Sequence, residues 1–168
     1  MSRRTVVWLV MALFTLHNLE EAVAFRTYLP RVVALLPERF ASPVATLSYP
    51  AMLIALATVS VVAFLVALAA STWPYSPLAL WTLLTLEAVV ALNVIAHVLS
   101  ALLVFHGYGP GLVTALVINA PFAIYCLRRA RRERWVSSAA MAAVVPAALI
   151  LHGPILLGGL WLASRSRN

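Results

Sequence analysis

The sequence predicts an all-α integral membrane protein, a single helical bundle of about five transmembrane helices. Two observations predict this fold class. Of the 168 residues, 64% are apolar and 10% are charged, whereas a soluble domain is about 45–50% apolar and 25% charged. The apolar residues also gather in runs of about 20 residues, the length that a helix needs to cross the hydrocarbon core of a bilayer. We therefore treat residues 1–168 as one transmembrane domain.

Five apolar runs are expected to cross the membrane. They cover residues 5–26, 45–71, 77–105, 111–127 and 137–162. Between the first two runs, residues 30–43 mix Pro, Arg and Glu with apolar residues, and this composition predicts a short segment that lies at the membrane interface. Residues 73–77, rich in Pro and aromatic residues, and the glycine-rich residues 107–111 predict tight turns between spans.

The basic residues predict how the chain is oriented. Arg3 and Arg4 precede the first run, and five arginines lie within residues 128–134, after the fourth run. With five crossings these two segments fall on the same side, so the positive-inside rule predicts a cytoplasmic N-terminus. Despite the net charge of +7, we interpret the arginine cluster as a contact for anionic lipid headgroups. We expect the lipid bilayer, and no nucleic acid, to be the partner of this surface.

Ionisable residues inside the apolar runs are the informative feature for function. They are Glu20, Glu21, Glu87, His17, His97 and His152. One ionised side chain at the centre of a bilayer costs about 2.5–3.5 kcal/mol even on the more lenient scale. These groups must therefore be paired, protonated or bound to a cation. Glu87 lies closer to the predicted cytoplasmic side than the others, so it is interpreted as a separate proton-relay or packing group.

Helical spacing and depth predict that most of these groups meet. His17, Glu20 and Glu21 share one face of the first helix, and Asn93 and His97 are neighbours at i, i+4 on the third. Counted at about 1.5 Å per residue from the external ends of the spans, polar groups of four helices lie about 8–15 Å deep. The residues at this level are Glu21, His97, Asn119, His17 and His152. The sequence thus predicts one polar pocket in the outer half of the bilayer.

Three motifs resemble a known family. The segment His17-Asn18-Leu19-Glu20-Glu21 is similar to the signature of the HXXEE family of small bacterial membrane proteins. That family also has a further histidine and a Tyr-x-Pro-Gly motif, which here are His97 and Tyr108-Gly109-Pro110-Gly111. The resemblance covers the chain from His17 to about Arg128. It implies a multi-pass protein of the bacterial inner (cytoplasmic) membrane and leaves the reaction open, because the family is largely uncharacterised.

The candidate site residues follow from these arguments. We expect His17, Glu20, Glu21 and His97 to be catalytic. If the pocket holds a metal ion, its ligands are expected among His17, Glu20, Glu21, His97 and His152. Asn93, Asn119 and Tyr108 are expected to support these side chains or to contact a substrate. Mixed imidazole and carboxylate ligands suit Zn, Fe or Mn.

Three classes of function are compatible with such a pocket. The first is an intramembrane enzyme that uses a divalent metal to act on a lipophilic small molecule. The second is a metal-free acid and base site, as in a membrane isomerase or cyclase, because two adjacent carboxylates can divide the roles of acid and base. The third is a proton or cation conduit, or a subunit of a larger membrane complex. We favour the metal because imidazoles converge with two carboxylates, and a homo-oligomer is compatible with all three classes.

Overall fold

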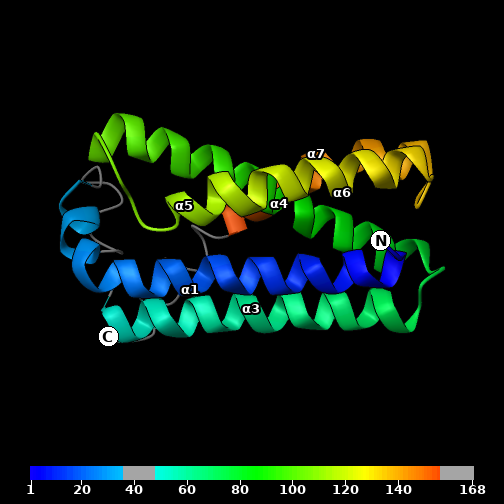
Figure 1. Ribbon diagram of the computed structural model, residues 1–168, viewed down its shortest axis with the longest axis horizontal. Coiled ribbons are helices and arrows are strands. Elements are labelled where there is room, and N and C mark those ends of the chain that lie inside the picture. Colours follow the sequence, from blue (N-terminus) through cyan, green and yellow to red (C-terminus); the bar gives the residue numbers. More distant parts are fainter. Residues whose placement is uncertain (36–47, 156–168) are drawn as a thin grey trace.

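The computed structural model describes residues 1–35 and 48–155, and these residues form a bundle of helices (Figure 1). The elements, in chain order, are α1 (Arg3–Leu35), α3 (Tyr49–Thr72), α4 (Pro77–Ser100), η1 (Ala101–Phe105), α5 (Leu112–Thr114), η2 (Ala115–Asn119), α6 (Ala120–Arg132), α7 (Ser138–Ile150) and η3 (Leu151–Ile155). Within the described ranges there is no β-strand. The predicted all-α fold class is therefore confirmed.

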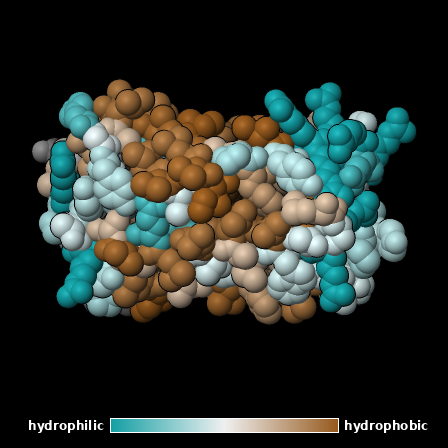
Figure 2. Space-filling model, viewed as in Figure 1, coloured by the Kyte–Doolittle hydropathy of each residue, from teal (hydrophilic) through white to brown (hydrophobic). Residues whose placement is uncertain are grey.

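In the part of the chain that the structure describes, four stretches of helix are long and apolar enough to cross a membrane: Arg3–Val32, Tyr49–Thr72, Pro77–Phe105 and Leu112–Arg132. A fifth, Ser138–Gly153, is apolar but shorter, and the rest of the predicted fifth run, residues 156–162, lies outside the described residues. Figure 2 shows the corresponding surface, with a hydrophobic band around the middle and hydrophilic residues gathered at the two ends. The chain is a membrane protein built from these helices.

The first helix is longer than the predicted run 5–26. It continues without a break through Pro30 to Leu35, so the beginning of the segment 30–43 is an extension of α1. Proline removes one backbone N–H from the helix, and transmembrane helices tolerate this loss when neighbouring groups re-satisfy the freed carbonyl. Residues 36–43 lie outside the described residues, and the interfacial location of the segment stays a prediction.

Serine caps begin three of the helices. The side chains of Ser48, Ser76 and Ser137 accept hydrogen bonds from backbone N–H groups of the first turns of α3, α4 and α7. A serine at this position satisfies one of the N–H groups that the first turn leaves free. Proline follows in the first turn of α3 and of α4, where its missing N–H costs nothing. These caps explain why the helices begin where they do.

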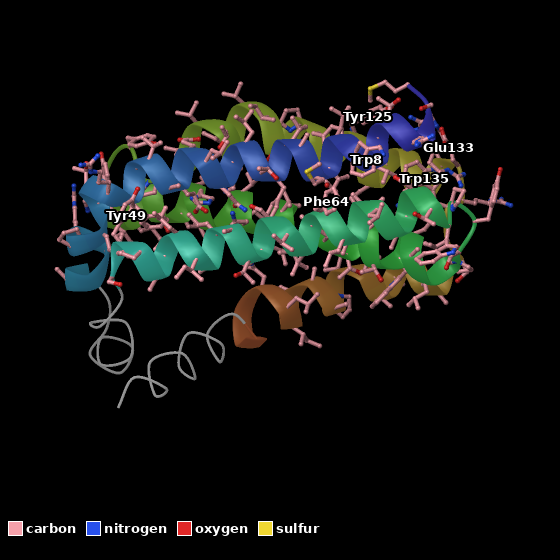
Figure 3. All side chains as sticks on the ribbon, turned by 90° about the horizontal axis from the view of Figure 1, so that it is seen from below. Trp8, Tyr49, Phe64, Tyr125, Glu133 and Trp135 are labelled. Atoms are coloured by element: carbon pink, nitrogen blue, oxygen red, sulfur yellow. The ribbon has the colours of Figure 1, made fainter. Side chains whose placement is uncertain are left out.

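Helix α4 is the centre of the bundle, because it packs against α1, α3, α6 and α7. Its buried face consists of Leu80, Leu83, Leu84, Thr85, Glu87, Ala88, Val90 and Val94. Helices α1 and α3 lie side by side, and the Trp8 and Phe64 rings meet between them with centroids 5.9 Å apart (Figure 3). At the other end of the same pair, the Tyr49 hydroxyl donates to the carbonyl of Ala22 at 2.9 Å.

The two basic segments lie at the same end of the bundle, as predicted. The Arg3 guanidinium lies 5.1 Å from the centroid of the Trp135 ring, and Arg129 forms an ion pair with Glu133 at 2.7 Å. Trp135 and Glu133 are at this end in Figure 3. The indole N–H of Trp135 and the Arg129 guanidinium both donate to Glu133 and lower the pKa of its carboxyl. This arrangement joins the start of α1 to the turn between α6 and α7.

Candidate functional site

Two histidines from different helices form the middle of the site. His17 of α1 is completely buried, and its Nε2 lies 3.1 Å from Nε2 of His97 of α4. The two rings meet edge to face, with centroids 4.8 Å apart and an angle of 78° between their planes. The predicted convergence of His17 and His97 is therefore found.

Glu21 completes a group of possible metal ligands. Its Oε1 lies 3.4 Å from Nε2 of His97, and both side chains are 13% exposed. One ligand atom from each of His17, Glu21 and His97 lies within 4.8 Å of the others. Two imidazoles and one carboxylate are a ligand set that proteins use for zinc and for non-haem iron. The structure thus brings together three of the five predicted metal ligands.

Glu20 has other partners, although it is adjacent to Glu21 in sequence. Its Oε1 accepts hydrogen bonds from the Tyr108 hydroxyl at 2.8 Å and from the Val113 backbone N–H at 3.2 Å. Its Oε2 accepts from the backbone N–H and the hydroxyl of Thr114, at 2.7 and 2.5 Å. Glu20 therefore anchors the first turn of α5 and the loop before α5 that contains Tyr108. It lies outside the group in which His17, Glu21 and His97 converge.

These hydrogen bonds also determine the tautomer of His17. The Thr114 hydroxyl has one proton, and its 2.5 Å contact with Glu20 directs that proton to the carboxylate. Nδ1 of His17, 2.8 Å from the same hydroxyl oxygen, must then be the donor of that bond. A neutral imidazole with a proton on Nδ1 has its lone pair on Nε2. Nε2 of His17 therefore points its lone pair toward His97.

His97 is oriented in the same way. The backbone of Pro110 lies close enough to the ring for a hydrogen bond, and because proline has no N–H, this bond would be donated by a ring N–H of His97 to the carbonyl. Nε2 faces His17 and Glu21, which leaves Nδ1 for this bond. In histidines that bind metals, the N–H of the second ring nitrogen usually donates a hydrogen bond to such a partner. Both imidazoles are thus held with Nε2 available as a ligand.

Asn93 bridges the two imidazoles. Its Nδ2 lies 2.9 Å from Nε2 of His17 and 3.0 Å from Nε2 of His97. The amide group has two N–H donors, so it can donate one to each lone pair. Asn93 was expected to support the ligands or to contact a substrate, and the structure brings it directly to them.

Gly111 forms the wall of the site opposite these side chains. Its φ of 78° is in the left-handed region that favours glycine. A Cβ atom at this position would lie 2.7 Å from Cε1 of His97 and 2.8 Å from Cε1 of His17. It would also lie 2.9 Å from Cγ of Glu21. The last glycine of the Tyr-Gly-Pro-Gly motif therefore lets the backbone pack directly against the three possible ligands.

The remaining predicted residues lie outside the convergent group. Tyr108 donates a hydrogen bond to Glu20 from the loop that precedes α5. His152 belongs to η3, which packs against α4. Asn119 is buried at the end of η2, and within the described residues its Nδ2 has no hydrogen-bond partner. Glu87 is buried in α4, likewise with an unpartnered Oε1. Roles for His152 and Asn119 in the site stay predictions.

Two contributors were not among the predicted site residues. Thr114 links Glu20 to His17, and Gly111 approaches both histidines. A signal for Thr114 exists in the sequence, because it follows the Tyr-Gly-Pro-Gly turn by three residues, in the first turn of a helix, where free N–H groups attract a carboxylate. The π-helical segments of residues 1–35 and 48–155 each lie near a polar residue, η1 after His97, η2 after Thr114 and η3 around His152. Such segments occur frequently at functional sites.

The hydrogen bond between Tyr108 and Glu20 leads to a pH prediction. Partial burial and this bond raise the pKa of Tyr108 from 10.0 to about 12. A phenolate has no proton to donate to Glu20, and its negative charge would lie against the Glu20 carboxylate. A folded-state pKa above the unfolded value stabilises the fold below pH 10 and loses this contribution as the pH rises toward 12. We expect the near-ultraviolet phenolate signal of Tyr108, obtained as the difference between wild type and Tyr108→Phe, to appear near pH 12. Appearance of that signal near pH 10 would contradict the bond.

The fold and the site together define a class: an all-helical membrane protein with a buried site of two histidines and one carboxylate. A family model described as "Protein of unknown function with HXXEE motif" matches residues 8–126, and the chain belongs to this family. No curated protein and no solved structure matches the chain. The match includes His17, Glu20, Glu21, His97 and the Tyr-Gly-Pro-Gly motif, so the resemblance derived from the motifs is confirmed.

Proposed function

We propose that the protein is an intramembrane enzyme that binds a divalent metal ion through His17, Glu21 and His97 and acts on a lipophilic substrate. One observation carries the proposal: two imidazole lone pairs and a carboxylate oxygen converge between helices that are apolar enough to cross a membrane. Two lone pairs 3.1 Å apart repel each other unless a cation or hydrogen-bond donors lie against both. A carboxylate buried at the level of the acyl chains likewise requires a cation or a proton.

Two of the distances within the group are those expected of ligands that share one metal ion. Ligand atoms about 2.0–2.1 Å from one ion lie about 2.9 Å apart at right angles and about 3.4 Å apart in a tetrahedron. The two histidine nitrogens are separated by 3.1 Å, and His97 and Glu21 by 3.4 Å. Zn, Fe and Mn all accept this ligand set. A bound ion would polarise a substrate oxygen or activate water or dioxygen, and Glu20 and Thr114 would hold His17 in its ligating tautomer.

A lipophilic substrate is supported by the surroundings of the site. A groove of about 480 Å³ lies beside it, lined by Val98, Ala101, Leu102, His106, Gly107, Leu112 and Leu116. Val98 follows His97 in sequence, and Leu112 follows Gly111. The lining is apolar apart from His106 and backbone groups, and Leu102 and Leu116 are exposed on the face that meets lipid. Molecules that enter such a groove are dissolved in the bilayer.

A metal-free site for acid and base chemistry is the second candidate, and Asn93 favours it. Because one amide N–H can donate to each Nε2, the two lone pairs are satisfied by hydrogen bonds alone. Glu21 would then act as the acid or base, as in a membrane isomerase or cyclase. The two candidates differ in whether a cation is bound.

The location and orientation of the protein are part of the proposal. Arg3 and the cluster of arginines at the end of α6 share one end of the bundle, which supports a cytoplasmic N-terminus by the positive-inside rule. We propose the bacterial inner membrane as its location and anionic headgroups as contacts of this end. The site would then lie in the outer half of the bilayer. A homo-oligomer is compatible with this arrangement.

The metal content of detergent-purified protein tests the proposal. We expect near-stoichiometric Zn, Fe or Mn in wild type and loss of this metal in His17→Ala and Glu21→Gln, because each substitution removes one ligand. Both variants should still insert into the membrane and, once a substrate is known, be inactive. Glu133→Gln, at the opposite end of the bundle, is the matched control and should keep its metal. If the wild-type protein stayed metal-free after incubation with each ion, the metal proposal would be overturned and the metal-free acid and base site would be favoured.

A further inference from the structure

The amide of Asn93 lies where a fourth ligand would be. Its nitrogen is 2.9 and 3.0 Å from the two histidine nitrogens, which are themselves 3.1 Å apart. These three atoms form a nearly equilateral triangle. Its edges fall within the range of about 2.9–3.4 Å expected for donors that share one ion. Asn93 also precedes His97 by one helical turn, so the same rigid stretch of α4 positions both side chains.

We propose that Asn93 is a ligand of the metal site, through its side-chain oxygen, after its amide group turns over. This inference rests on the proposed metal site. A half-turn about the Cβ–Cγ bond exchanges the amide nitrogen for the oxygen at nearly the same point. The nitrogen orientation donates hydrogen bonds to the two Nε2 lone pairs. The oxygen orientation presents a lone pair to a cation between those nitrogens, so no backbone movement is required.

The charge balance explains the use of an amide at this position. Glu21 contributes one negative charge, and a histidine that binds a metal through Nε2 is neutral. A divalent ion with Glu21 and an amide oxygen leaves a net charge of +1 at the site, whereas a second carboxylate would reduce it to zero. The remaining positive charge preserves the ability of the ion to polarise a substrate. Glu20 contributes no ligand, because four hydrogen bonds already occupy its oxygens.

Binding of Co²⁺ to the purified protein is the test, since its visible absorption reports the number and geometry of its ligands. We expect Asn93→Ala to weaken Co²⁺ binding by about 10–100-fold and to change the spectrum. Asn93→Asp keeps an oxygen at this point and should bind at least as tightly as wild type, with a spectrum close to the wild-type one. Asn93→Leu, of nearly the same shape as Asn, replaces the alanine variant if the latter does not fold.

Asn18→Ala is the matched control, because Asn18 is also a buried amide but bonds to Ser60 of α3 at 2.8 Å. It should bind Co²⁺ with wild-type affinity and spectrum. Wild-type binding that Asn93→Ala or Asn93→Leu leaves unchanged in affinity and spectrum would overturn the role of Asn93 and leave the metal site in place. Failure of wild type itself to bind Co²⁺ or Zn²⁺ would overturn both proposals.

Discussion

Gly111→Ala is expected to abolish metal binding with a single methyl group. That methyl would lie within 3 Å of side-chain atoms of His17, His97 and Glu21, which is closer than carbon atoms approach. The three side chains must then move apart, and we expect the affinity for Zn²⁺ or Co²⁺ to fall on the order of 100-fold or more. The left-handed backbone adds a cost of about 1–2 kcal/mol for any residue with a Cβ. Titration with Co²⁺ and thermal unfolding in detergent measure the two effects.

Gly153→Ala is the control for this substitution. A Cβ at Gly153 meets no atom within 4 Å, so neither stability nor metal affinity should change appreciably. A Gly111→Ala protein that bound Co²⁺ as wild type does would show that the loop is not held against the histidines.

Glu20→Ala is expected to cause the largest loss of stability among the residues of the site. The substitution removes the acceptor for the Tyr108 hydroxyl, the Thr114 hydroxyl and two backbone N–H groups. A hydrogen bond to a charged group contributes about 1.5–3 kcal/mol, and the partly exposed position and shared partners reduce the sum, so we expect about 2–4 kcal/mol in total. Unfolding by heat or denaturant in detergent, compared with wild type, measures this loss.

Metal binding by the Glu20→Ala variant tests whether Glu20 supports the metal ligands without being a ligand itself. Without Glu20 the Thr114 hydroxyl can reverse its bond and donate to His17, so the tautomer is no longer determined. We expect metal affinity to fall by about 10–100-fold, as for other partners that orient a ligand. Glu133→Ala removes a glutamate at the opposite end of the bundle and should leave metal affinity unchanged, although it loses the bonds to Arg129 and Trp135. A Glu20→Ala protein as stable as wild type would contradict the role of Glu20 as the anchor of α5.

Much of the site follows from the periodicity of helices. His17 and Glu21 are separated by four residues, as are Asn93 and His97, so each pair shares a helix face wherever the helix packs. The cost of burying a carboxylate or an imidazole in the hydrocarbon core then requires the two faces to meet. Composition, the apolar runs and the distribution of arginines were likewise sufficient to predict the all-α membrane fold and the common end of the two basic segments.

The division of roles between Glu20 and Glu21 could not be derived in this way. Adjacent residues point about 100° apart on a helix, and their partners depend on which elements lie in those two directions. Glu20 meets the start of α5, whereas Glu21 meets His97. The same limit applies to Asn119. Counting residues from the end of a span gives the depth of a side chain in the bilayer, but it does not give the direction in which the side chain points within the membrane plane.

The sequence by itself determined that this chain is a helical membrane protein of the HXXEE family with histidines and glutamates buried among its helices, since composition and spacing act within single elements. The tertiary structure decided which of these groups converge. It separated Glu20 as an anchor from Glu21 as a possible ligand, brought Asn93 to both histidines, and placed the backbone of Gly111 against them. The physical reason is that hydrogen bonds and close contacts between helices depend on their rotation and mutual packing, which one-dimensional periodicity leaves open.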